Sequence, residues 1–459
     1  MSEAPTLNVI NPASGASVRT YTGHTEAEAT GFIEAATAAQ RAWRRTSFAA
    51  RAAVLNEAAA LLRGRKDRYA ELMAVEMGKP IGGGRSEVEK CAWVCEHYAE
   101  HAEGYLAPRA IESDAARSYV ACQPLGVVLA VMPWNFPFWQ VFRFLAPAVM
   151  AGNGGLLKHA SNVPGSALAI EEIMRDAGLP EGLFKTLLIS ASKVERVIQH
   201  PGVAAVTLTG STPAGKAVAA AAGAVLKKTV LELGGSDPYV ILEDADLDRA
   251  AELCATSRLI NSGQSCIAAK RLVVVDAVHD AFVEKVKARM QARVLGDPLD
   301  EATDVGPQAR VDLRDELHDQ VVRSVKAGAR LVLGGEVPGR PGAWYPPTLL
   351  VDVTEDCPAY SEELFGPVAS VIRAKDEAGA IRIANDSVFG LGAAVFTRDE
   401  ERGRRIAEQE LEAGCCFVNS FVKSDPRLPF GGIKESGYGR ELEGLGIREF
   451  VNQKTVYVA

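Results

Sequence analysis

Cysteine is scarce in this sequence. Only 8 cysteines occur among 459 residues, and they are scattered rather than clustered. A chain with so few, dispersed thiols does not have a disulfide framework. We therefore expect a protein of a reducing compartment, the cytoplasm.

Positively charged residues are also fewer than negatively charged ones. The 50 Lys and Arg residues are outnumbered by 58 Asp and Glu residues, which gives a formal net charge of -8. Binding to nucleic-acid phosphates requires a basic surface, and the sequence holds no basic cluster. These features argue against a general nucleic-acid binder.

Long apolar runs and a secretory signal are also missing. No charged residue occurs between Arg117 and Arg143, but Pro124, Pro133 and Pro137 interrupt this stretch. A membrane-spanning helix needs about 20 mostly apolar residues, so we expect no membrane span. The first residues lack a basic region followed by an apolar run, so we also expect no secretory signal.

What the sequence does have is an ordinary globular composition, with 47% hydrophobic and 24% charged residues. Its length predicts two or three domains. The first hundred residues are predicted to be helical, with Gly82–Gly84 as a breaker between helices. From residue 126 to 233 short apolar runs alternate with helical stretches, and a second alternation begins at 239. This pattern predicts two α/β domains, the first with a doubly wound parallel sheet.

Two polar segments follow predicted strands. Asn135 lies in the sequence Pro-Trp-Asn-Phe-Pro (133–137), at a point where α/β folds place their ligand loops. Its amide is suited either to donate to an oxyanion or simply to hold the loop. Lys158 ends the next predicted strand. Its ammonium is suited to a phosphate or a ribose, although a lone lysine is more often just solvated.

A third segment, residues 209–217, joins a strand to a helix through a glycine-bounded turn. A helix N-terminus after such a turn is a natural anion site. The spacing of Gly210, Gly215 and Lys216 matches the phosphate loop of nucleoside triphosphatases. Ala217, however, replaces the Ser or Thr whose hydroxyl would hold magnesium. The triphosphatase alternative therefore lacks its metal ligand.

A carboxylate and a thiol complete the candidates. Glu232 ends an apolar strand just before two glycines, where a carboxylate must be paired or act as a base with a raised pKa. Cys266 follows Gly-Gln-Ser. A lone cysteine is more often a small buried hydrophobe, and no Cys–His signature of a thiol hydrolase is apparent.

One helical stretch carries four possible metal ligands, Cys91, Cys95, His97 and His101. The two cysteines share one face and the two histidines share another. Four tetrahedral ligands do not come from one helix in this way. We therefore expect no metal site.

Together and in this order, these segments resemble the aldehyde dehydrogenase superfamily. The shared motifs are PWNFP, LELGGSDP, GQSC, EELFGPV (362–368) and PFGGIKESGYGRE (429–441). The resemblance extends from Asn11 to the C-terminal strand. It implies an α/β fold with a Rossmann-type cofactor domain, an α/β catalytic domain and a small β element for oligomerisation.

The resemblance also implies roles for individual residues. Cys266 matches the nucleophile that forms a thioester with an aldehyde. Asn135, with the N–H of Cys266, matches the oxyanion hole, and Glu232 matches the base that activates water. A nicotinamide dinucleotide is expected to contact a further set of positions: Trp134, Lys158, Ser161, Gly210, Ser211, Glu363 and Phe365.

Within the superfamily, the chain is most similar to the succinate-semialdehyde dehydrogenases. Arg143, Arg271 and Ser424 match positions that in those enzymes bind the distal carboxylate of the substrate. An anionic tail suits guanidinium donors, although either arginine is alternatively a structural ion-pair partner. Glutarate semialdehyde or another short aldehyde with an acid group would satisfy the same anchors. Ala268 stands where some of these enzymes carry a second cysteine, so this chain cannot form their redox disulfide.

The cofactor preference depends on one departure from the family pattern. Ser161 stands where NAD-preferring members usually carry a glutamate. A carboxylate there would repel a 2′-phosphate, whereas Ser161 with Lys158 would not. We therefore expect NADP, with NAD as the alternative.

The expected domain boundaries follow the same resemblance. The cofactor domain comprises residues 1–112 and 125–233, and the catalytic domain comprises 234–425. An oligomerisation hairpin (113–124) and the C-terminal segment 426–459 predict a homodimer or homotetramer. A non-catalytic protein on the same fold would lack a nucleophile or a base, yet Cys266, Asn135 and Glu232 are all present.

Overall fold

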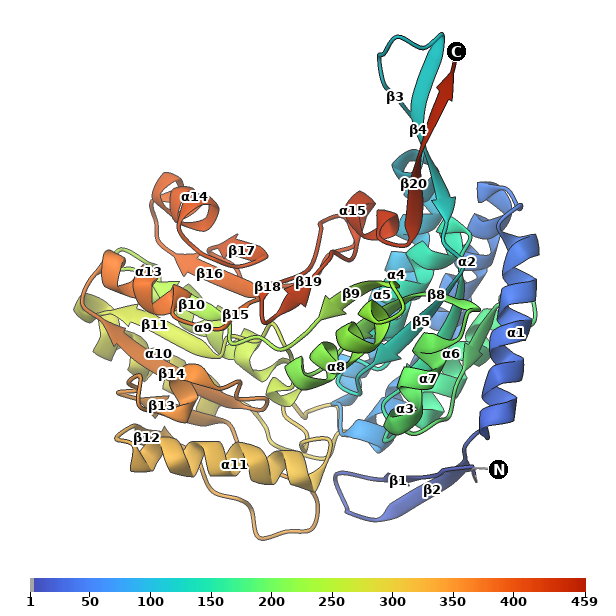
Figure 1. Ribbon diagram of the computed structural model, residues 1–459. Coiled ribbons are helices and arrows are strands. Elements are labelled where there is room, and N and C mark those ends of the chain that lie inside the picture. The colour runs from blue at the N-terminus through green and yellow to red at the C-terminus, as the bar shows by residue number, and fades with distance from the viewer. Residues whose placement is uncertain (1–3) are drawn as a thin grey trace.

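The computed structural model describes residues 4–459. An antiparallel pair of strands and four helices form its N-terminal part (Figure 1). These are β1 (Thr6–Ile10), β2 (Ser17–Thr22), α1 (Glu26–Trp43), α2 (Phe48–Gly64), α3 (Lys66–Met77) and α4 (Ile81–Tyr105).

The expected break at Gly82–Gly84 is wrong, because these glycines lie inside α4. Helix α3 ends instead at Met77, where Gly78 adopts a left-handed φ of 77°. A Cβ at Gly84 would lie 2.9 Å from the Cα of Ala70 in α3. The glycine therefore lets α4 pack closely against α3, and this tertiary contact outweighs the low helix propensity of glycine.

A six-stranded sheet has the order β19-β9-β8-β5-β6-β7 and is parallel except for β19. Its strands are β5 (Val127–Met132), β6 (Gly154–His159), β7 (Phe184–Thr186), β8 (Val203–Thr209), β9 (Lys228–Glu232) and β19 (Gly437–Tyr438). The connecting helices are α5 (Trp139–Ala151), α6 (Pro164–Asp176), α7 (Val194–Gln199) and α8 (Thr212–Gly223). The doubly wound parallel sheet is thus confirmed.

A seven-stranded sheet has the order β12-β13-β14-β11-β10-β16-β17, with only β12 antiparallel to its neighbour. Its strands are β10 (Pro238–Ile241), β11 (Arg271–Val275), β12 (Arg330–Leu333), β13 (Thr348–Val351), β14 (Val368–Ala374), β16 (Gly392–Phe396) and β17 (Cys415–Val418). Its helices are α9 (Leu247–Leu259), α10 (His279–Gln291), α11 (Val311–Lys326), α12 (Pro358–Ser361), α13 (Glu377–Asn385) and α14 (Glu400–Gln409).

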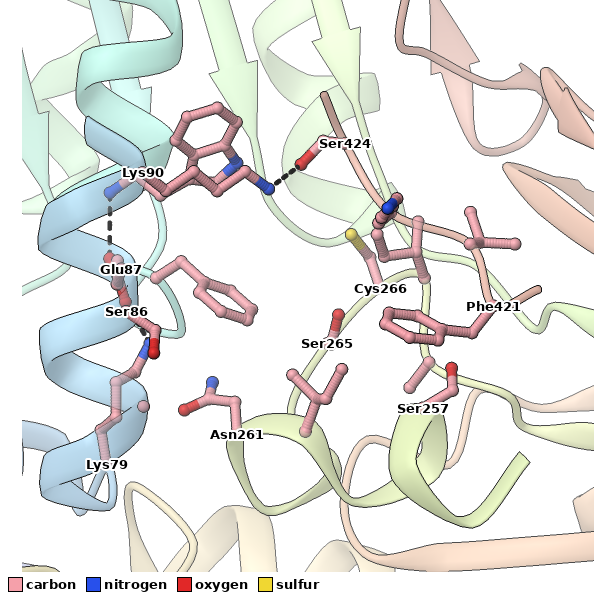
Figure 2. A pocket seen from close by; sticks show the side chains of 18 of the residues that line it. Lys79, Ser86, Glu87, Lys90, Ser257, Asn261, Ser265, Cys266, Phe421 and Ser424 are labelled. Carbon is pink, nitrogen blue, oxygen red and sulfur yellow. Dashed lines mark hydrogen bonds and ion pairs between the residues drawn. The ribbon is translucent and has the colours of Figure 1, made fainter. Parts of the chain in front are cut away.

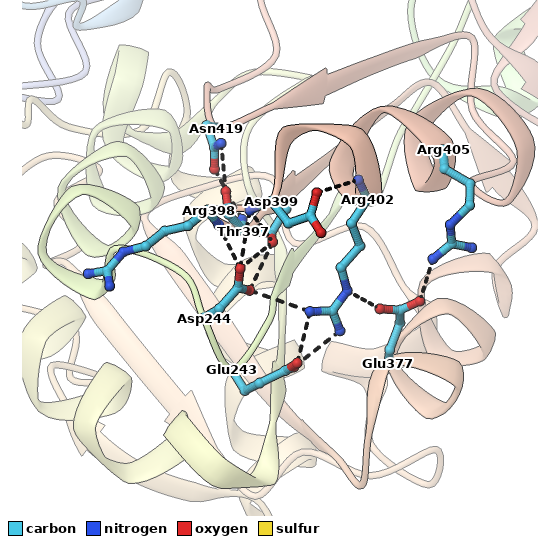
Figure 3. Close-up of polar contacts among 9 residues, drawn as sticks. All are labelled: Glu243, Asp244, Glu377, Thr397, Arg398, Asp399, Arg402, Arg405 and Asn419. Atoms are coloured by element: carbon cyan, nitrogen blue, oxygen red, sulfur yellow. Dashed lines mark hydrogen bonds and ion pairs between the residues drawn. The ribbon is translucent and has the colours of Figure 1, made fainter.

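Charged residues fasten the loops of this second sheet to α13 and α14 (Figure 3). Arg402 in α14 binds Glu243 after β10 at 2.8 Å and also forms an ion pair with Glu377 in α13. Asp244 accepts hydrogen bonds from the backbone N–H groups of Arg398 and Asp399 at the start of α14. These contacts fix the helices over the sheet edge.

Three of the remaining strands form an arm that projects from the body (Figure 1). The C-terminal strand β20 (Val451–Val458) pairs along its whole length with β4 (Arg117–Pro124), and β4 also pairs with β3 (Arg109–Ala110). Helix α15 (Glu443–Arg448) leads into β20, and β15 (Phe389–Gly390) pairs with β18 (Ile433–Lys434). Within residues 4–459, no helix has the length and apolarity needed to cross a membrane.

Candidate active site

The first sheet has a topological switch point between β5 and β8. From β5 the chain proceeds to β6 and β7 on one side, and then returns to β8 and β9 on the other. In open parallel sheets, ligands bind outside the carboxyl ends of the strands at such a point. Trp134 and Asn135 follow β5, and Gly210 and Ser211 follow β8.

These loops line a cavity of about 710 Å³, called here the larger cavity. Among residues 4–459, no side chain caps the N-terminus of α8. Pro213 has no N–H, so the N–H groups of Thr212 and Ala214 are the first-turn donors free for an anion. Seven of the residues predicted from the sequence line this cavity: Trp134, Asn135, Gly210, Ser211, Cys266, Glu363 and Phe365.

Glu363 and Phe365 enter the larger cavity from the second sheet. Glu363 accepts a hydrogen bond from the N–H of Gly235 at 3.1 Å and forms an ion pair with Lys270 at 3.0 Å. The rings of Phe365 and Trp134 meet edge to face, with centroids 5.7 Å apart. The cavity therefore offers an oriented carboxylate beside two aromatic rings.

The loop that carries Cys266 is tightly fixed. Asn261 and Ser262 adopt left-handed φ values of 54° and 56°, which is unusual for residues with side chains. A Cβ at Gly263 would lie 2.2 Å from the backbone of Gly366, so only glycine fits there. The buried ammonium of Lys270 donates to the carbonyls of Ser265 at 2.9 Å and Cys266 at 2.7 Å.

Asn135 and Cys266 share the wall of the larger cavity. The buried side chain of Asn135 donates from Nδ2 to the carbonyl of Gln264 at 3.1 Å, which leaves its second amide proton available. The N–H of Cys266 makes no hydrogen bond to any residue in the range 4–459. Two free donors thus lie at the nucleophile loop, as an oxyanion hole requires.

Glu232 ends β9 and is only 2% exposed. Neither carboxylate oxygen has a hydrogen-bond partner within the described residues. Burial raises its pKa well above the usual range; Arg143 opposes this shift and Glu441 adds to it. The side chain packs against Gly431 and lines neither the larger cavity nor the smaller cavity described next.

A second cavity of about 490 Å³, called here the smaller cavity, is also lined by Cys266 (Figure 2). Of the predicted residues, it is lined by Cys266, Arg143 and Ser424. Arg143 is buried, forms an ion pair with Glu441 and donates to Thr209 at 3.2 Å. Cys266 is therefore the predicted nucleophile that faces both cavities.

The smaller cavity also contains charged residues that the sequence analysis missed. Lys79, Glu87 and Lys90 line it from the N-terminal end of α4 and the turn before it. Lys79 and Glu87 form a buried ion pair, and Glu87 also accepts the N–H groups of Phe138 and Trp139 at the start of α5. No local motif marks these residues, because only the packing of α4 on α5 brings them to the site.

The structure does not bring Arg271, the third predicted substrate anchor, into the smaller cavity. This residue begins β11. Its guanidinium instead donates to the carbonyls of Ser236, Ile383 and Ala384, each at 2.9 Å. Each of its three nitrogens thus donates to a backbone carbonyl.

Lys158 and Ser161 lie at the carboxyl end of β6 but outside the larger cavity. Lys158 pairs in register with Val131 of β5, and Ser161 is exposed. Burial lowers the pKa of the Lys158 ammonium. Both residues therefore occupy the same sheet edge as the cavity, one strand farther from the switch point.

The comparison with protein families agrees with this geometry. Residues 1–456 match the description "Aldehyde dehydrogenase family". The chain belongs to the aldehyde dehydrogenase family. Its fold is correspondingly shared with solved structures at TM-scores of 0.96 and 0.97.

Named relatives of this aldehyde dehydrogenase are similar over nearly their whole length. A Synechocystis protein, named probable succinate-semialdehyde dehydrogenase for NADP(+), is 50% identical and covers 99% of this chain and 100% of that protein. The succinate-semialdehyde dehydrogenase for NADP(+) of Mycolicibacterium paratuberculosis is 51% identical over 98% of this chain and 96% of its own. The crystal structure of succinic semialdehyde dehydrogenase from Streptococcus pyogenes, in complex with NADP+, superposes with a TM-score of 0.96 at 39% identity, covering 98% of this chain and 99% of that one.

Proposed function

We propose that this aldehyde dehydrogenase oxidises succinate semialdehyde to succinate with NADP+. The observation that carries the proposal is the position of Cys266 in the walls of two different cavities. One has the features of a dinucleotide site, and the other is lined by two buried cations, Lys79 and Arg143, and by the half-buried Lys90. The names of the relatives that share half of its sequence support the same substrate and cofactor.

The residues of the larger cavity fit a nicotinamide dinucleotide. The uncapped N-terminus of α8 suits a pyrophosphate. Glu363 suits the hydroxyls of the nicotinamide ribose, while Trp134 and Phe365 offer ring faces. Lys158 and Ser161, at the end of β6, would hold the adenosine ribose with its 2′-phosphate. When bound, the cofactor supplies the acceptor for the hydride released by the substrate carbon.

Three residues then carry out the chemistry on the substrate. The thiolate of Cys266 attacks the aldehyde carbon, and the resulting oxyanion accepts hydrogen bonds from the Asn135 amide and the Cys266 N–H. Loss of hydride from this carbon leaves a thioester on Cys266. Glu232, whose raised pKa suits a general base, takes a proton from the water that hydrolyses the thioester to succinate. For this step its side chain must turn from Gly431 toward Cys266, because it lines neither cavity in this structure.

Steady-state kinetics test this proposal. Succinate semialdehyde, glutarate semialdehyde and the neutral four-carbon aldehyde butanal would each be assayed with NADP+ and with NAD+. We expect kcat/KM to be at least about tenfold higher for succinate semialdehyde than for butanal, and higher with NADP+. A preference for butanal would overturn the proposed substrate, and a preference for glutarate semialdehyde would replace it.

A Ser161→Glu variant tests the proposed preference for NADP+. A carboxylate at this position repels the 2′-phosphate, so kcat/KM with NADP+ should fall at least about tenfold while that with NAD+ is retained. Equal or better turnover of the parent enzyme with NAD+ would contradict the proposed cofactor.

A further inference from the structure

Lys90 differs from the other cations of the smaller cavity. It projects from the third turn of α4, and its ammonium donates to the hydroxyl of Ser424 at 2.7 Å (Figure 2). It also lies 4.1 Å from the centroid of the Trp139 ring. No carboxylate of residues 4–459 lies within ion-pair distance of it.

The two neighbouring cations are already compensated. Lys79 is paired with Glu87, and Arg143 is paired with Glu441. A charge removed from water without a partner is costly, and a protein reduces that cost by shifting the pKa or by binding a counter-ion. Burial, assisted by Arg143, lowers the pKa of Lys90 to about 8. Lys423 also lines this cavity but is exposed to solvent. Lys90 is thus the half-buried cation of the cavity whose charge remains to be neutralised.

The hydroxyl of Ser424 is also free to donate to a ligand in the cavity. Its oxygen accepts the hydrogen bond from Lys90, and its hydroxyl proton has no acceptor within the described residues. One N–H of Lys90 and the O–H of Ser424 are therefore both available to a group in the cavity. A carboxylate, with two acceptor oxygens, matches this pair of donors.

We propose that Lys90, together with Ser424, binds the distal carboxylate of the aldehyde and so selects an anionic substrate. This inference rests on the proposed oxidation of succinate semialdehyde and assigns to Lys90 the role that Arg271 does not fill. Arg143 remains mainly engaged with Glu441 and Thr209. Lys90 acts in substrate capture, so its loss should raise KM and leave kcat nearly unchanged.

A second consequence is a pH dependence of substrate selection. The charged or titratable groups around Lys90 are Glu87 and Cys91 on its own helix, Arg143 on α5 and Asp425 in the loop of Ser424. An ammonium that deprotonates near pH 8 loses its attraction for a carboxylate above that pH. The ratio of kcat/KM for succinate semialdehyde to that for butanal should therefore fall by up to about tenfold per pH unit above 8. Groups that act on both aldehydes cancel in this ratio.

The test compares the wild-type enzyme with Lys90→Met, Lys90→Arg and Lys326→Met, each assayed with both aldehydes at saturating NADP+. Lys326, an exposed lysine at the end of α11, is the control for loss of a positive charge. In Lys90→Met, KM for succinate semialdehyde should rise about 10- to 100-fold while KM for butanal does not rise. Lys90→Arg should retain most of the selectivity, and Lys326→Met should match the wild type.

The outcomes separate this inference from the proposed function. If the wild type does not prefer succinate semialdehyde to butanal, both fail. If the wild type has the preference and Lys90→Met keeps it, the role of Lys90 is wrong while the proposed function stands. If Lys90→Met does not fold, the wild-type pH profile decides: a selectivity ratio that stays constant from pH 7 to about 9.5 overturns the inference, and a falling ratio supports it.

Discussion

The thiol of Cys266 is in an environment that keeps it protonated. Burial raises its pKa to about 12, although Lys270 and Arg143 act in the opposite direction. The thiolate, rather than the thiol, is the nucleophile. Without ligands, the enzyme therefore holds Cys266 in a form that resists oxidation and alkylation.

This environment predicts the reactivity of Cys266 in the enzyme without ligands. At a pH below the pKa, each increase of one pH unit raises the thiolate fraction tenfold. The rate of alkylation by iodoacetamide should therefore rise about tenfold per unit between pH 7 and 10. Peptide mass spectrometry after timed quenching measures this rate at Cys266 separately from the other cysteines. A plateau near pH 8 would show that the thiol is already ionised and would contradict this account.

At the residue scale, the sequence predicted the parts of the site that lie in local motifs. Asn135, Gly210 and Cys266 each follow a strand or a tight turn, so their neighbours in sequence indicate their place. Lys90 carries no such signal, because α4 reaches the cavity only through its packing on α5. Arg271 is only five residues from Cys266, but proximity in sequence does not determine which way its side chain points.

At the element scale, apolar alternation predicted most strands of both sheets, whereas the glycines led to a wrong helix boundary. Gly82–Gly84 were expected to break a helix but lie within α4, because close contact with α3 favours them there. The correct helix boundary is set by Gly78 and Pro80. A glycine at a close helix contact and a glycine at a helix end look alike in sequence, and only the packing separates them.

Arg271 also acts at the element scale, because it binds the last carbonyls of α13. The carbonyls of Ile383 and Ala384 lie at the end of that helix and have no further helical partner. Arg271→Met leaves them and the Ser236 carbonyl unpaired, so the free energy of unfolding should fall by about 3 kcal/mol.

Denaturant unfolding measures this loss of stability. The selectivity for succinate semialdehyde over butanal is measured in the same variant. We expect that selectivity to be unchanged in folded Arg271→Met. A variant of wild-type stability with lost selectivity would restore Arg271 as a substrate anchor.

At the scale of the whole molecule, the projecting arm has exposed apolar side chains. Tyr457 is 54% exposed and Val458 is 48% exposed on β20, and Ile111 after β3 is 41% exposed. The strands β3 and β20 also leave the outer edges of their small sheet open. Exposed edges and apolar groups of this kind favour association with another copy of the chain.

We therefore predict that the arm is needed for a homodimer or homotetramer. Removal of residues 453–459 should convert the oligomer to a smaller species, which sedimentation velocity at several concentrations would detect. A Lys454→Glu variant, changed at a single exposed position of the same strand, is the control for a change of charge. The prediction is wrong if the truncated enzyme folds and keeps the mass of the full-length assembly.

The most direct measurement is peptide mass analysis of rapidly quenched and digested enzyme, combined with NADPH absorbance, for the parent and for Cys266→Ser. With succinate semialdehyde and NADP+, the parent should gain the mass of one succinyl group on the peptide that contains Cys266. The variant should gain none and should form NADPH about 10⁴-fold more slowly. Formation of NADPH by Cys266→Ser at the parent's rate would contradict covalent catalysis through this sulfur.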